Sequence, residues 1–172
     1  IMIAIANTLA ISLYLIAAGL QAAYLLNISK QPKRSLLIFI GLGAVLAHAF
    51  SAIHTIYADQ LLDTGFFRVS SLIFWFVALI SLLSILRRPT SNLLIVLFPL
   101  AAASVMVASL APHSKHLAHG ISIGIFSHIL TSILAYSMMT IAVIQAIALA
   151  LQERHLKHHH IGGILGALPP LQ

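Results

Sequence analysis

The stretch from Gly124 to His160, GIFSHILTSILAYSMMTIAVIQAIALALQERHLKHHH, decides how this chain folds. Between Gly124 and Leu151 the sequence contains no Asp, Glu, Lys or Arg. At ~1.5 Å per residue, a helix over that run is longer than the ~30 Å hydrocarbon core of a bilayer. A charged, histidine-rich segment follows it. The pattern predicts a transmembrane helix that carries one titratable side chain, His128, and we expect its ring to face the interior of a helix bundle.

The composition of the whole chain is that of a membrane protein. Of the 172 residues, 60% are hydrophobic and 7% are charged, whereas a soluble domain carries ~25% charged residues. The chain has no cysteine, which excludes disulfides and thiolate metal sites. The net charge of +6 comes from short basic clusters between apolar runs, a pattern typical of membrane topology. We therefore expect the lipid bilayer as a partner and no nucleic acid.

Earlier apolar segments extend this prediction to an all-α, polytopic membrane helix bundle with about five transmembrane helices. Basic residues concentrate in the first and third connections and in the tail, so the positive-inside rule places the amino end outside and the carboxyl end in the cytoplasm. We treat residues 1–172 as a single transmembrane domain, and we expect it to be the amino-terminal part of a longer membrane protein. The predicted spans are 2–26, 36–58, 69–86, 92–110 and 124–151.

The second span carries two histidines that lie on different faces of the helix. His54 is ~9 Å further along the helix than His48 and about 120° round from it, so the two rings do not point at one partner. His48 falls near mid-membrane depth, where an imidazole is costly without a partner. Two interpretations of His48, functional and structural, stay open. His54 is nearer the membrane edge, where its ring can reach water.

One face of the last helix consists mainly of small residues. Such a face lets a second backbone or a flat macrocycle approach closely. His128 on this face is a candidate metal ligand, and the alternative is a hydrogen bond to a neighbouring helix with no further role. The residues of this face lie within roughly 40° of one another around the helix axis: Gly124, His128, Ser132, Ala135, Met139, Ala142 and Ala146.

The residues around His128 carry a resemblance to a known family. The motif HILTSILAY at 128–136, followed by an apolar helix and by QERHLK at 152–157, resembles a segment of the CcsA/HemX-like cytochrome c assembly family, in particular its YpjD-like inner-membrane branch. The resemblance extends back over most of the chain. It implies a multi-pass protein of the bacterial inner (plasma) membrane, with His128 as a haem ligand on the outer side and with Ser132 and Tyr136 in the same motif.

Two departures from the family pattern narrow the expected function. The tryptophan-rich haem-presenting motif is absent, since Trp75 is the one tryptophan of the chain. Family members also continue with further spans after a Pro-Pro-Leu like that at 169–171. We therefore expect no enzymatic activity, but a protein that holds or passes haem b. The expected ligands are His128 and His48, with His54 in the same region, because two neutral imidazoles give a low-spin b-type site.

Several alternatives remain open at this stage. His113, His116 and His119 are candidate second ligands or simply hydrated loop residues, and Lys115 and Arg68 are candidates for binding the haem propionates. The acidic pair Asp59 and Asp63 is interpreted as a solvated edge. Two other functions stay open beside haem transfer. The first is a non-haem membrane scaffold or accessory subunit of a transporter, and the second is a bis-His electron carrier. Other membrane subunits or a second copy of the chain are the expected protein partners.

Overall fold

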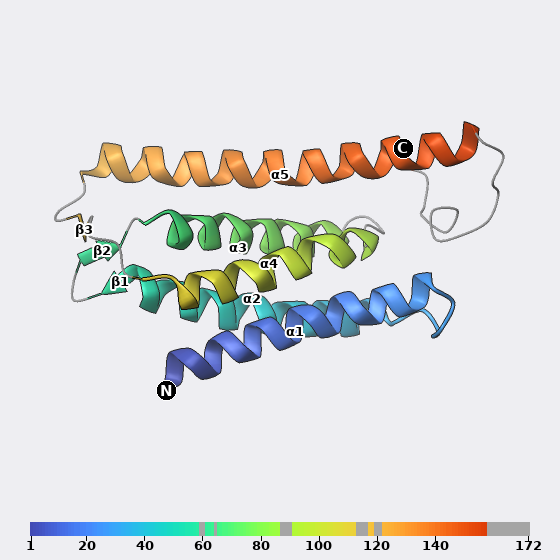
Figure 1. Ribbon diagram of the computed structural model, residues 1–172, viewed down its shortest axis with the longest axis horizontal. Helices are drawn as coiled ribbons and strands as arrows, with labels where there is room; N and C mark the ends of the chain where they lie inside the picture. The colour runs from blue at the N-terminus through green and yellow to red at the C-terminus, as the bar shows by residue number, and fades with distance from the viewer. Residues whose placement is uncertain (59–60, 64, 87–90, 113–116, 119–121, 158–172) are drawn as a thin grey trace.

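The computed structural model describes residues 1–58, 61–63, 65–86, 91–112, 117–118 and 122–157 (Figure 1). In this part of the chain, five helices are long and apolar enough to cross a membrane, which confirms the predicted polytopic helical fold. A short 3-10 helix, η1 (Ser91–Leu93), precedes the fourth of them. The α-helices are α1 (Met2–Leu25), α2 (Arg34–Ile56), α3 (Phe66–Ile85), α4 (Leu94–Leu110) and α5 (Ile123–Lys157).

Successive helices run in opposite directions, and α5 lies along one side of the bundle (Figure 1). The first four helices form the compact part, in which α1 packs against α2 and α4, and α3 packs against the same two helices. Helix α5 packs mainly against α3. The α1–α2 connection, the end of α3, the start of α4 and the carboxyl end of α5 lie at one end of the bundle. The ends of α2 and α4 lie at the other.

The core of the four-helix part is built from alanines around a few aromatic rings. Tyr14 of α1 and Phe98 of α4 are fully buried, with ring centroids 5.0 Å apart in an edge-on arrangement. Gly41 of α2 sits so close to its neighbours that an added Cβ would lie 2.7 Å from Leu82 Cδ1 and 3.3 Å from Phe98 Cζ. Small side chains are what allow membrane helices to approach each other this closely.

A small antiparallel sheet, which the sequence did not indicate, joins the connections at one end of the bundle. Its strands are β1 (Tyr57–Ala58), β2 (Leu61–Asp63) and β3 (Leu117–Ala118), in the order β1-β2-β3. Leu62 pairs with Ala118 across the β2–β3 ladder. The sheet therefore ties the α2–α3 connection to the α4–α5 connection.

Beside this sheet, Asp63 forms a buried ion pair, and the interpretation of Asp63 as a solvated edge was wrong. The Asp63 residue is 1% exposed, and its Oδ2 lies 3.3 Å from Nε of Arg68, which is 4% exposed. Asp63 Oδ1 accepts a hydrogen bond from the Gly65 amide at 2.9 Å, and Arg68 Nη1 donates to the Ala108 carbonyl at 2.8 Å. Arg68 thus joins the start of α3 to the end of α4, and we no longer assign it to haem propionates. Asp59 lies outside the described residues.

Candidate functional site

His48 lies inside the bundle, and both of its ring nitrogens have a partner. The residue is 0% exposed. Its Nδ1 is 3.2 Å from the hydroxyl oxygen of Tyr14 on α1, and its Nε2 is 2.9 Å from the hydroxyl oxygen of Ser71 on α3. A neutral imidazole has one donor and one acceptor nitrogen, so two hydroxyl groups satisfy it completely. This geometry favours the structural interpretation of His48, because a metal ion would have to displace one of the two hydroxyls.

Other polar contacts between the same helices surround this histidine. Ser51, one turn further along α2, donates its hydroxyl hydrogen to the side-chain oxygen of Asn7 on α1. Trp75 of α3 donates its indole N–H to the Val45 carbonyl at 2.9 Å. Ser71, the partner of His48 on α3, was not singled out from the sequence. Its position inside an apolar span was the available signal, because polar groups there usually bond across helices.

His54 is close to the end of α2, and its ring is turned toward its own helix. Its Nδ1 lies 3.0 Å from the carbonyl oxygen of Phe50, one turn earlier, and the two rings have centroids 4.2 Å apart. The side chain is exposed. No hydrogen bond connects His54 with His48 among the described residues, in keeping with their predicted placement on different faces.

His128 lies near the start of α5, on the outer surface of the bundle, so the expectation that its ring faces the bundle interior was wrong. The residue is exposed, and within the described residues its ring has no hydrogen-bond partner. Ser132, one turn further along α5, is half-buried, and Tyr136 is 58% exposed. His128 therefore differs from His48 in having both ring nitrogens available to a ligand.

The face of α5 that carries His128 is turned away from α3. The helix packs on α3 through its other side, where Ile133 and Ser137 are buried and the Ser137 hydroxyl lies 3.1 Å from the Ile73 carbonyl oxygen. The small-residue face predicted from the sequence is thus open. Besides His128, its exposed members are Gly124, Ala135, Met139, Ala142 and Ala146.

The structure does not bring the three candidate histidines of the spans together. His48 lies between α1 and α3, whereas α5 lies on the far side of α3 and α4 from α1 and α2 (Figure 1). Among the described residues there is no group of three or more histidines and acidic residues placed to hold a metal ion. The loop histidines at 113, 116 and 119 and the lysine at 115 lie outside the described residues.

Comparisons of the chain with protein-family models, with curated proteins and with solved structures give no match. Among the described histidines, His128 offers two ring nitrogens to a ligand, at the edge of the bundle and beside small side chains.

Proposed function

We propose that this chain is a haem-binding protein of a bacterial inner membrane, which holds or passes haem b, and that His128 of α5 supplies an axial ligand. The observation that carries the proposal is the contrast between two imidazoles. His48 is buried and satisfied by Tyr14 and Ser71, whereas His128 is exposed and has no partner among the described residues. A titratable group on a membrane helix normally faces protein, a cavity or a ligand, so His128 is expected to meet a further component.

The surroundings of His128 fit one side of a haem. Gly124 and Ala135 have no bulky side chain, so a flat macrocycle can lie against this face of α5. An imidazole nitrogen is a usual axial ligand of haem iron. The hydroxyl groups of Ser132 and Tyr136 follow at ~6 Å and ~12 Å along the helix axis, and they can donate hydrogen bonds to polar groups of a bound ligand.

A second protein ligand, if the haem has one, would not come from the described residues. His48 would have to give up a hydrogen bond, and the ring of His54 is turned to Phe50 on its own helix. The remaining sources are the loop histidines at 113, 116 and 119 and a histidine of another subunit or of a second copy. We therefore assign His128 alone as a haem ligand. The geometry of His48 does not support a bis-His electron carrier that uses His48.

The proposal is tested by the absorption spectrum of protein purified from haem-replete cells. We expect a Soret band in the unmodified chain and its loss in His128→Ala. His54→Ala is the matched control, since it removes an exposed imidazole from another membrane helix and should keep the band. The absence of a Soret band from the unmodified chain, or a band of equal intensity in His128→Ala, would refute the proposal.

A non-haem membrane scaffold or transporter accessory subunit is the second candidate, and the exposure of α5 favours it. Over the most apolar 18 residues of each span, 17% of the residues are buried in α5, against 33–39% in the other four spans. A helix this uncovered offers its small-residue face to further helices. Co-purification of a stoichiometric membrane partner without bound haem, lost when Ala135 is replaced by Leu, would support this candidate over the first.

A further inference from the structure

A polar pocket lies at the end of the bundle opposite the sheet, and neither candidate function uses it. It occupies about 350 Å³ between the end of α1, the start of α2, the end of α3 and η1. Its floor is apolar, formed by the buried side chains of Leu37 and Ile85. Its walls carry hydrogen-bonding groups, namely the amides of Gln21 and Gln31 and the hydroxyl of Ser91.

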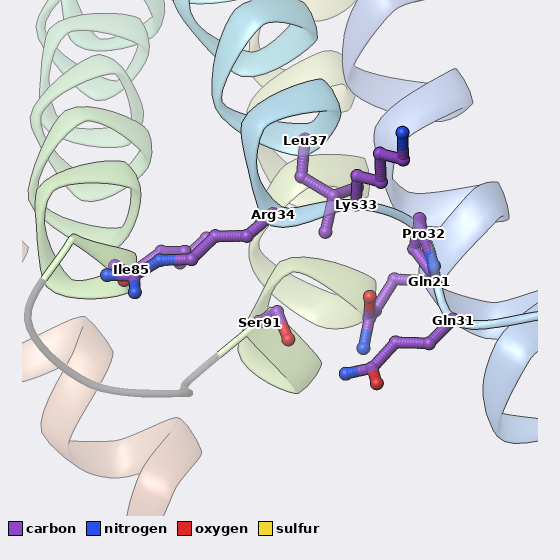
Figure 2. Close-up of a pocket in the computed structure, with 8 residues that line it drawn as sticks. All are labelled: Gln21, Gln31, Pro32, Lys33, Arg34, Leu37, Ile85 and Ser91. Carbon is purple, nitrogen blue, oxygen red and sulfur yellow. The ribbon is translucent and has the colours of Figure 1, made fainter.

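Figure 2 shows how these groups are arranged. In this view the side chains of Gln21 and Gln31 end near one another, toward Ser91. Gln21 is buried and held in place, because its side-chain nitrogen donates to the Asn92 side-chain oxygen at 2.7 Å. Arg34 extends across to the last turn of α3, where Nη2 donates to the Ile85 carbonyl.

Among the described residues that line the pocket, Lys33 and Arg34 are charged, and both are positive. A guanidinium has five N–H donors, and the bond to Ile85 uses one of them, so others remain for a ligand. Lys33 is exposed, and in Figure 2 its ammonium group points away from Gln21, Gln31 and Ser91, so a ligand would draw it over the pocket by rotation of its four-carbon side chain. Helix α2 begins at Arg34, and its unpaired first amides add positive potential at the same place.

This end of the bundle also has little acidic charge to neutralise those cations. Among the described residues, Glu153 is the one acidic residue at this end, since Asp63 lies in β2 at the other end. Five of the six described Lys and Arg residues lie at this end: Lys30, Lys33, Arg34, Arg154 and Lys157.

We infer that this pocket binds a phosphate group, with Lys33 and Arg34 as its charged ligands and the neutral donors of Gln21, Gln31 and Ser91 beside them. Phosphate oxygens are strong acceptors, and both Arg and Lys bind them through charge-assisted hydrogen bonds. The group can come from the headgroup of an anionic phospholipid or from a soluble phosphate. A headgroup would enter at the membrane surface, where this end of the bundle lies if the helices span the bilayer.

The test measures ligand binding to the full chain in a neutral detergent, by native mass spectrometry and by thermal unfolding. The probes are phosphatidylglycerol, diacylglycerol with the same acyl chains but no phosphate, and inorganic phosphate. The variants are Lys33→Gln and Arg34→Gln. Lys30→Gln is the matched control, because Lys30 is exposed in the same connection and does not line the pocket. Lys33→Gln retains the Arg34–Ile85 bond, so it reports on binding even if Arg34→Gln disturbs the end of α3.

A lipid source predicts one phosphatidylglycerol per chain, bound on the order of tenfold more weakly in Lys33→Gln and unchanged in Lys30→Gln. A soluble source predicts that inorganic phosphate raises the unfolding temperature of the unmodified chain and of Lys30→Gln, but not of Lys33→Gln. Either result supports the site. Equal binding of diacylglycerol and phosphatidylglycerol, an equal loss in Lys30→Gln and Lys33→Gln, or no binding of any probe would overturn it.

Discussion

Two histidines of the spans, on α2 and α5, show how the same residue type serves different purposes. The His48 ring joins α1, α2 and α3 through Tyr14 and Ser71. The His128 ring has no such partner among the described residues. An unsatisfied polar group is costly within a membrane. His48 therefore stabilises the packing of three helices, whereas His128 is expected to bind a ligand or a partner helix.

Replacing His48 by Ala should destabilise the folded bundle. The change removes two hydrogen bonds, leaves two buried hydroxyl groups without their partner, and opens a cavity at a fully buried position. Such losses amount to about 2–5 kcal/mol in the free energy of unfolding. Unfolding in mixed micelles at increasing denaturing-detergent concentration would measure the change.

His54→Ala serves as the control, because that ring is exposed and bonded only within its own helix, and we expect a change below about 0.5 kcal/mol. If His48→Ala were as stable as His54→Ala, the structural role of His48 would be wrong. A folded His48→Ala that had lost haem while remaining stable would instead make His48 a ligand.

At the scale of single elements, α2 depends on glycine where α3 and α4 approach it. A Cβ at Gly41 would come within 2.7 Å of Leu82 Cδ1, whereas nothing lies within 4 Å of a Cβ at Gly19 in α1. Gly41→Ala should therefore destabilise the bundle by about 1–3 kcal/mol through overpacking. Gly19→Ala should be neutral or slightly stabilising, because alanine is the better helix former.

The same unfolding measurement compares the two alanine variants directly. Both changes add one methyl group to a helical glycine, so their difference reports the packing around Gly41 and not helix propensity. Equal stability of the two variants would show that the Leu82 side chain moves aside at no cost. The close approach of α2 to α3 would then not limit the stability of the bundle.

The helices were predictable from the sequence because each is a long apolar run between basic turns or loops. The small-residue face of α5 followed from residue spacing, but its exposure did not, because His128 on that face was expected to point into the bundle. The partners of His48 did not, since Tyr14 and Ser71 are 34 and 23 positions away in the chain. The sheet was missed because strands of two or three residues have no recognisable periodicity. The burial of Asp63 was missed because its ion pair to Arg68 depends on that sheet.

At the scale of the whole molecule, the two ends of the bundle differ in charge. The end with the α1–α2 connection carries five of the six Lys and Arg residues that the structure describes. At the opposite end Arg68 is buried and paired with Asp63. Basic residues in short loops near the ends of spans are retained in the cytoplasm, so this asymmetry predicts that the sheet end faces outward.

Single-cysteine labelling can test that orientation, because the natural chain has no cysteine. Ser29, after α1, and Pro112, after α4, are both exposed and lie at opposite ends of the bundle. In intact cells, a membrane-impermeant maleimide should label Pro112→Cys, and it should label Ser29→Cys only after the membrane is permeabilised. The reverse pattern would place His128 near the cytoplasmic surface, and haem would then have to be bound from that side. Labelling of both variants in intact cells would mean that the charge asymmetry does not set one orientation.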